Sequence, residues 1–170
     1  PPTLMYFQQG VWREIDRVLS ANPYLRNRIG VHDQDRNRTL AQRGSIERSF
    51  ATIDLSSASD LVSYELVKGV FRGTKVLRYL VATRSRQTLL PDGRLLSLKK
   101  FAPMGSALCF PVETIIFASV CELVTRELRV SGQYSVYGDD IIVPTQCAVR
   151  TMQVLAILGF RVNDEKSYYH

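Results

Sequence analysis

The sequence predicts an α+β domain with a mainly antiparallel sheet and helices packed on one face. Apolar residues recur at helical spacing in the segments 4–19 and 111–128, and short β-prone runs stand at 50–54 and 134–143. A two-residue turn interrupts the last run, and such turns join antiparallel neighbours. Because strands and helices alternate along the chain, the helices are expected to pack against that sheet.

The predicted elements follow one another without a repeat or a clear linker. The first helix covers 4–19 and stops at Asn22-Pro23. A polar connection of about 25 residues follows, and a structureless segment that long is typical of a functional loop. The later elements are a strand at 50–54, helices at 58–69 and 72–82, a hairpin around Pro91-Asp92-Gly93, a loop at 102–108, a helix from Pro111 to Leu128, a hairpin of 134–137 and 140–143, a helix at 149–158 and a strand at 160–162.

Composition narrows the class of protein. The 170 residues are 45% hydrophobic, enough for the core of one domain, and the net charge of +6 favours a polyanionic partner. No apolar stretch approaches the roughly 20 residues that span a bilayer, so no membrane partner is expected and the default compartment is the cytoplasm. The three cysteines form no Cys-x-x-Cys or Cys/His cluster, which excludes a zinc-site pattern. Arginines are concentrated in one stretch: Arg26, Arg28, Arg36, Arg38, Arg43 and Arg48.

Two adjacent carboxylates mark the candidate site. Tyr137-Gly138-Asp139-Asp140 forms a tight turn between β-prone runs, where Gly138 permits the positive φ that the turn needs. Asp54 ends another such run far upstream. Each feature alone also fits an ordinary polar turn or cap. Three carboxylates that meet would repel one another unless a cation joined them, and oxygen ligands without His or Cys favour Mg²⁺ or Mn²⁺. Two such ions are the requirement of nucleotidyl transfer.

Four segments together resemble motifs A to D of viral RNA-dependent RNA polymerases. They are, in order, Thr52 to Asp60 (TIDLSSASD), Pro103 to Phe110 (PMGSALCF), Tyr137 to Ile142 (YGDDII) and Gly159 to Ser167 (GFRVNDEKS). The set most resembles the replicase of the RNA bacteriophages, the levivirus group, and next the narnavirus and ourmiavirus enzymes. The resemblance covers about residues 40–170. It implies a polymerase palm subdomain at 49–170, preceded by a segment at 1–48 that connects it to the fingers.

The resemblance also implies roles for single residues. Asp54, Asp139 and Asp140 match the ligands of two Mg²⁺ ions, for which Mn²⁺ can substitute, and Lys166 matches the motif D lysine that protonates the pyrophosphate leaving group. Ser59 and Asp60 fall among the ribose-binding residues, although many relatives place the acid five residues after the first aspartate and here the spacing is six. An alternative for Asp60 is a capping box with Ser57.

Motif B supplies further candidates. Gly105 and Ser106 match the flexible loop that approaches the template and the nucleotide, and Glu113 stands where many positive-strand enzymes have a ribose-sensing asparagine. RNA-phage enzymes often carry Asn-Gly where this chain has Ser106-Ala107, and Phe-Glu-Leu-Glu where it has the run 110–113 (FPVE), which weakens assignment to one particular family. The candidates for RNA contact are Arg43, Arg84 and Arg86.

The expected function is template-directed addition of ribonucleotides to an RNA 3′ end during viral genome replication. Its partners would be RNA template and product, ribonucleoside triphosphates and, by the resemblance, host translation factors in the cytoplasm of an infected bacterial cell. The triphosphate-binding fingers and the thumb are expected outside residues 1–170. The alternatives are a reverse transcriptase palm, a non-enzymatic RNA-binding α+β module and a nucleotide cyclase. The cyclase lacks support because its Gly-Gly-Asp/Glu-Glu-Phe turn is missing.

Overall fold

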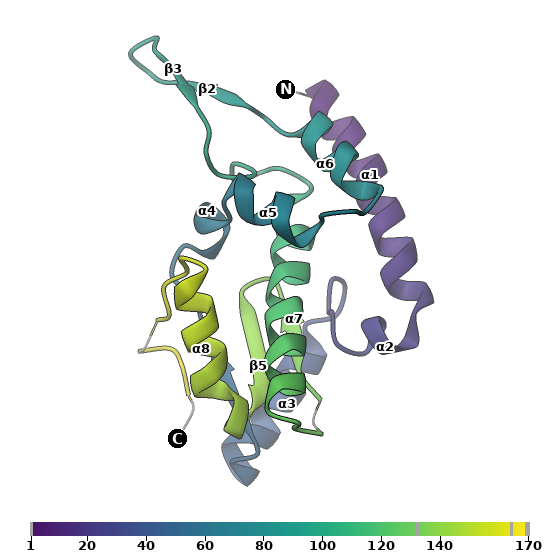
Figure 1. Ribbon diagram of the computed structural model, residues 1–170, viewed down its shortest axis with the longest axis vertical. Coiled ribbons are helices and arrows are strands. Elements are labelled where there is room, and N and C mark those ends of the chain that lie inside the picture. Colours follow the sequence, from purple (N-terminus) through teal and green to yellow (C-terminus); the bar gives the residue numbers. More distant parts are fainter. Residues whose placement is uncertain (1, 132, 164, 169–170) are drawn as a thin grey trace.

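The computed structural model describes residues 2–131, 133–163 and 165–168, and it confirms the α+β class with antiparallel sheets. A long helix, α7, runs beside a small central sheet, while α1 and α6 lie to one side and a separate hairpin projects from the top (Figure 1). In chain order the elements are α1 (Pro2–Ala21), α2 (Pro23–Arg26), α3 (Asp35–Glu47), β1 (Phe50–Ile53), α4 (Ala58–Leu61), α5 (Tyr64–Val70), α6 (Val76–Thr83), β2 (Gln87–Leu89), β3 (Leu95–Ser97), α7 (Cys109–Glu127), β4 (Ser135–Tyr137), β5 (Asp140–Pro144), a 3₁₀ turn (Thr145–Cys147) and α8 (Ala148–Ile157).

The central sheet has the order β1-β5-β4, and both of its strand pairs are antiparallel. In the β1–β5 ladder Ile53 pairs with Ile141, and in the β4–β5 hairpin Tyr137 pairs with Asp140. The end of β1 and the turn of the hairpin therefore lie at the same edge of the sheet. This register brings the residue after Ile53 close to the Asp139-Asp140 turn, which positions the candidate site.

The core lies between this sheet and the helices α7 and α8. Alternate residues of the strands, among them Ala51 and Ile53 of β1, are buried in the cluster that these helices complete. Near the same helices, the rings of Phe117 and Phe160 meet edge to face with 4.9 Å between their centroids. Burial of a large apolar side chain contributes about 1.5–3 kcal/mol to stability. The packing of α7 and α8 on the sheet therefore stabilises the position of the β4–β5 hairpin.

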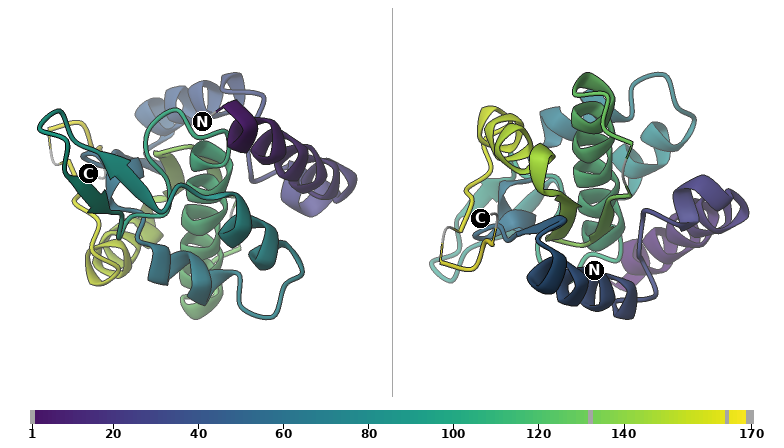
Figure 2. Two further views of the ribbon diagram at one scale, coloured as in Figure 1. Left: turned by 90° about the horizontal axis from the view of Figure 1, so that it is seen from above. Right: turned by 90° about the horizontal axis from the view of Figure 1, so that it is seen from below.

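The segment expected to be a structureless connection contains the helices α2 and α3. The side chain of Asn22 caps α2 by accepting hydrogen bonds from the N–H groups of Tyr24 and Leu25. Helix α3 packs on the face of the sheet opposite to α7 and α8 (Figure 2). It approaches β1 closely, because a Cβ at Gly44 would lie 2.8 Å from the carbonyl oxygen of Phe50. The sheet is thus covered on both faces, so the prediction that helices pack on only one face is corrected by α3.

Three local predictions differ from the structure. The helix expected over 58–69 is divided into α4 and α5 at Val62, and the Ser63 hydroxyl caps α5 by accepting from the N–H of Leu66 at 3.1 Å. The capping box of Ser57 and Asp60 is not formed, since Ser57 has a φ of 54° and its side chain makes no capping hydrogen bond. The expected strand at 160–162 is reduced to one isolated bridge between Leu55 and Val162.

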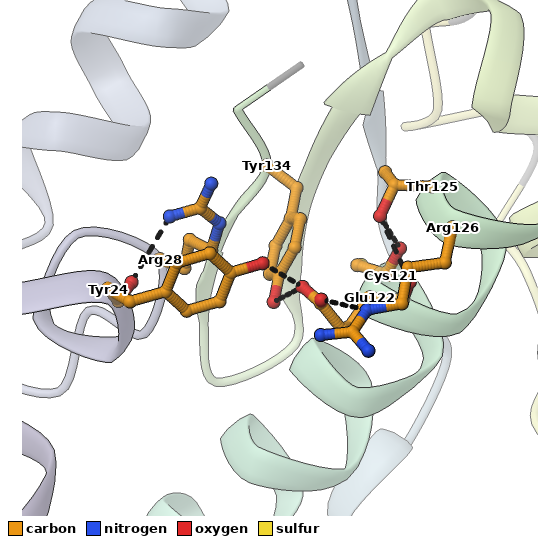
Figure 3. Close-up of polar contacts among 7 residues, drawn as sticks. All are labelled: Tyr24, Arg28, Cys121, Glu122, Thr125, Arg126 and Tyr134. Atoms are coloured by element: carbon orange, nitrogen blue, oxygen red, sulfur yellow. Dashed lines mark hydrogen bonds and ion pairs between the residues drawn. The ribbon is translucent and has the colours of Figure 1, made fainter. Parts of the chain in front are cut away.

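A polar cluster ties the N-terminal segment to α7 (Figure 3). The carboxylate of Glu122 accepts hydrogen bonds from Tyr24 Oη at 2.6 Å, Tyr134 Oη at 2.9 Å and Arg126 Nε at 2.5 Å. Burial acts to raise the pKa of Glu122, but the three donors outweigh it and the pKa lies below its ordinary value. The Arg28 guanidinium stacks 3.7 Å from the centroid of the Tyr24 ring.

Among the described residues, no helix is long and apolar enough to cross a membrane.

Candidate active site

The turn that carries Asp139 and Asp140 closes the hairpin of β4 and β5 and is fixed from α7. Gly138 has a φ of 59°, which confirms the predicted positive value. Its N–H donates to the Thr114 hydroxyl at 3.0 Å, and a Cβ at this position would lie 2.6 Å from the ring of Phe110. Helix α7 therefore holds the turn by a hydrogen bond and a ring contact that requires glycine.

Asp54 directly follows β1 and is held by the segment after α8. Its N–H donates to the Ser167 hydroxyl at 3.2 Å, and its carbonyl oxygen accepts from the N–H of Asn163 at 2.9 Å. Asn163 also donates from Nδ2 to Asp54 Oδ2 at 3.1 Å. Sequence reasoning included Asn163 and Ser167 in motif D without a role, and only the fold shows that both contact motif A.

Asp140 is held from the other side of the sheet by α3. Gln34 Nε2 donates to Asp140 Oδ2 at 3.1 Å, and Asn37 Nδ2 donates to the Asp140 carbonyl oxygen at 2.9 Å. Asn37 is only 4% exposed, and its Oδ1 is buried without a hydrogen-bond partner. Sequence reasoning missed both residues because it expected a loop here.

The acidic groups influence one another electrostatically. Loss of hydration raises the pKa of Asp139, the charges of Asp140 and Asp54 raise it further, and Lys166 acts in the opposite direction. Burial, together with the charge of Asp139, raises the pKa of Glu113 to about 7, and Glu113 Oε2 is buried without a partner. The fold thus brings the three predicted aspartates and Lys166 into one electrostatic neighbourhood.

A cavity of about 230 Å³ lies at this edge of the sheet. Asp54, Asp140 and Lys166 line it together with Gln34, Asn37 and Arg38 of the α3 region. Lys166 is exposed there. Carboxylates can bind a hard cation and a lysine can bind a phosphate, so the cavity combines groups that both ligands require.

The donor set fits Mg²⁺ or Mn²⁺, because it consists of carboxylate oxygens without His or Cys. A cation would also offset the mutual repulsion that helps to raise the pKa of Asp139. Within the part of the chain that the structure describes, however, no three acidic, His or Cys side chains are grouped closely enough to hold one metal ion. The three aspartates are neighbours and do not form a joint ligand set in this arrangement.

The motif B loop is fixed by a residue that sequence reasoning missed. Gln8 of α1 is only 4% exposed, and its Oε1 accepts from the Ser106 hydroxyl and from the N–H of Ala107, each at 3.2 Å. Its Nε2 donates to the Thr83 carbonyl oxygen at 2.8 Å. Gly105 has a φ of 89° with no atom near its Cβ position. The loop is therefore anchored just after its most adaptable residue.

The remaining candidates occupy different environments. Asp60 forms an ion pair with Lys100 Nζ at 2.5 Å, and Ser59 is half-buried in α4. Arg84 is 9% exposed, and its guanidinium donates to the carbonyl oxygens of Phe101, Leu98 and Lys100 and lies over the Tyr64 ring.

Arg84 therefore braces the loop at 98–101, and these contacts account for the side chain without RNA. Arg86 is exposed, and Arg43 is exposed beside Glu47, with 3.4 Å between the charged groups.

Two solved telomerase structures share this fold. A structure of telomerase from Candida albicans matches 95% of this chain and 33% of its own with a TM-score of 0.62 at 11% identity. Apo telomerase from Candida tropicalis matches 97% of this chain and 40% of its own with a TM-score of 0.55 at 12% identity. At these identities the likeness concerns the fold alone. The chain itself belongs to the RNA replicase, beta-chain family, whose profile matches residues 1–170.

Several curated relatives agree with this family. The chain is 38% identical over 168 residues to the RNA-directed RNA polymerase beta chain of Enterobacteria phage GA, covering 99% of this chain and 30% of that protein. It is 37% identical to the corresponding protein of Escherichia phage MS2, with the same coverage, and 37% identical to that of Qbeta virus (strain MX1), covering 97% of this chain and 27% of that protein. The chain thus spans less than a third of the length of these relatives.

Proposed function

We propose that this chain is the palm of an RNA-directed RNA polymerase that adds ribonucleotides to an RNA 3′ end and releases pyrophosphate. Residues 49–170 form the palm in this proposal, and residues 1–48 connect it to the fingers. The observation that carries the proposal is that Asp54, the Asp139-Asp140 turn and Lys166 lie near one another at one edge of the sheet, in a chain of the replicase beta-chain family.

Asp54, Asp139 and Asp140 would hold two divalent cations, Mg²⁺ or Mn²⁺. When bound, such ions activate the attacking 3′ hydroxyl and stabilise the leaving oxygen. The hairpin and β1 keep the carboxylates at one edge of the sheet, and Lys166, which lines the same cavity, would give a proton to the departing pyrophosphate. Gly105 and Ser106 would approach the incoming nucleotide.

Nucleotide selection is assigned to residues around this centre. Ser59 and Asp60 would contact the ribose, with Lys100 holding Asp60 in place. Glu113 is a candidate for ribose recognition by its motif B position only, because its Oε2 is buried. The exposed Arg43 and Arg86 would contact the RNA backbone. The phage relatives support replication in an infected bacterial cell. The cytoplasm as compartment and host translation factors as partners stay predictions.

The test is template-directed synthesis by the full-length polymerase that contains this chain. Asp139→Asn should abolish nucleotide incorporation and leave RNA binding nearly intact, since the substitution keeps the shape of the turn and removes one charge. Asp92→Asn in the exposed β2–β3 hairpin is the matched control and should keep wild-type synthesis. An unchanged extension rate in Asp139→Asn would contradict the proposal.

Two further measurements separate the alternatives. Preference for deoxynucleotides over ribonucleotides would favour a reverse transcriptase, and RNA binding without any synthesis by the full-length protein would favour a binding module. The isolated 170 residues should not synthesise RNA, because the triphosphate-binding fingers are expected elsewhere.

A further inference from the structure

Two side-chain amides hold the two carboxylates that face the cavity. Gln34 Nε2 donates to Asp140 Oδ2, and Asn163 Nδ2 donates to Asp54 Oδ2, each at 3.1 Å. The two amides come from opposite sides of the site, one from the start of α3 and one from the segment after α8, and they are separated from their partners by 106 and 109 residues of sequence. We propose that Gln34 and Asn163 are positioning residues that orient Asp140 and Asp54 for a divalent cation.

The chemistry of the donors supports this role. Asp54 and Asp140 line the same cavity, so each carboxylate faces the negative charge of the other. Such a group would turn away unless a donor held it. A lysine or arginine could hold it, but a fixed positive charge would then compete with a metal ion. An amide N–H orients the oxygen and leaves the charge of the carboxylate available.

Each carboxylate is fixed through its backbone as well. The carbonyl oxygen of Asp140 accepts from Asn37 Nδ2, and the carbonyl oxygen of Asp54 accepts from the N–H of Asn163. The backbone contacts set the place of each residue, and the side-chain amides set the direction of each carboxylate. Because these two functions are carried by different contacts, loss of an amide should change metal affinity more than it changes stability.

Gln34 offers the cleaner test. Its side chain makes no capping hydrogen bond to α3 and is exposed, so the near-isosteric Gln34→Met removes the donor without opening the core. Asn163→Leu is the corresponding change at the other carboxylate. Gln42→Met in α3 and Gln153→Met in α8 are matched controls, since both residues are exposed and neither lines the cavity.

The experiment titrates Mn²⁺ into the full-length protein and follows the free ion by electron paramagnetic resonance, together with the Mg²⁺ dependence of RNA synthesis and the melting temperature. Loss of a residue that hydrogen-bonds to a metal ligand typically weakens metal affinity about 10- to 100-fold. Gln34→Met should weaken Mn²⁺ binding by such a factor, and its synthesis should recover at high Mg²⁺. The controls should bind Mn²⁺ like the wild type. Asn163→Leu should behave as Gln34→Met does, and if it fails to fold, Gln34→Met decides alone.

The inference rests on the proposed function, and the outcomes separate the two. If the wild-type protein binds Mn²⁺ and Gln34→Met binds it with the same affinity, the positioning role is overturned and the proposed function is not. A melting temperature that falls while Mn²⁺ affinity stays constant would also overturn it, because it would indicate a purely structural contact. A wild-type protein that neither binds Mn²⁺ nor makes RNA would overturn the proposed function and this inference with it.

Discussion

The ring of Phe110, in the first turn of α7, lies directly against the backbone of Gly138 in the Asp139-Asp140 turn. A Cβ at Gly138 would be 2.6 Å from Phe110 Cε2 and 3.1 Å from Cδ2, and Phe110 is itself packed edge to face on Tyr137 at 4.9 Å. Motif B and motif C are therefore in direct contact through one ring. Glycine at position 138 is required both by its φ of 59° and by this contact.

Gly138→Ala should consequently destabilise the protein and strongly reduce synthesis. Gly93→Ala is a matched control, because Gly93 also has a positive φ, 82°, but no atom lies near its Cβ position. The positive φ alone costs about 1–2 kcal/mol with a Cβ, so both variants should melt earlier than the wild type. Thermal unfolding of the full-length protein should show the larger fall for Gly138→Ala, and equal falls would contradict the role of Phe110.

Gln8→Leu should impair use of nucleotides although Gln8 lies in α1, outside the four motifs. The substitution leaves the Thr83 carbonyl without this partner and removes one of the two hydrogen bonds of the half-buried Ser106 hydroxyl. An unsatisfied buried group costs about 1–3 kcal/mol. The motif B loop should then be less well fixed, and the KM for nucleotides should rise. Steady-state kinetics against Gln9→Leu, an exposed neighbour, provide the comparison. Equal KM values in the two variants would show that the loop does not depend on α1.

Glu122→Gln should lower stability at neutral pH and have little effect in acid. The pKa of Glu122 is lowered in the folded protein, so its ionised form stabilises the fold above the ordinary carboxyl pKa, and this contribution is lost as the pH falls through the lowered value. Melting temperatures of wild type and variant should therefore converge once the pH falls below the lowered pKa of Glu122. Glu14→Gln, at an exposed pair, should show a smaller difference at pH 7. A difference that persists at low pH would contradict the ionic role.

Lys166→Met should slow synthesis by about 10²- to 10⁴-fold, the usual contribution of a general acid, and leave RNA binding largely unchanged. Lys75→Met, an exposed lysine next to α6, is the control and should keep the wild-type rate. Single-turnover incorporation with a bound primer separates the chemical step from binding. A rate that is normal in that assay would exclude Lys166 as the proton donor.

Helices and strands with a clear apolar pattern, such as α1 and α7, were predictable from sequence. Helix α3 was not predicted, and its residues show why. Its buried residues are Asn37, Leu40 and Gly44, which follow helical spacing but include only one large apolar side chain. The pattern that identifies a helix is the recurrence of apolar residues, and here a polar amide and a glycine take their places. Asn37 is buried to hold Asp140, and Gly44 is buried because β1 passes too close for a Cβ.

The candidate site was predictable in its charged residues and not in its supporting contacts. Asp54, Asp139, Asp140 and Lys166 belong to motifs whose residue types indicate their chemistry. Gln8, Gln34 and Asn163 are common polar residues, and their partners lie 98, 106 and 109 residues away in the sequence. Only the three-dimensional arrangement of the chain distinguishes them from solvated surface amides.

The β1–β5 ladder sets how far the sequence can change in length. Side chains on a strand alternate between the two faces, so one inserted or deleted residue between Phe50 and Ile53 would shift the pairing with β5 and turn Asp54 away from the Asp139-Asp140 turn. The exposed β2–β3 hairpin has no such partner in the central sheet. Over evolutionary time, variation in length should therefore accumulate in that hairpin, while the spacing of β1 and β5 from their aspartates stays fixed.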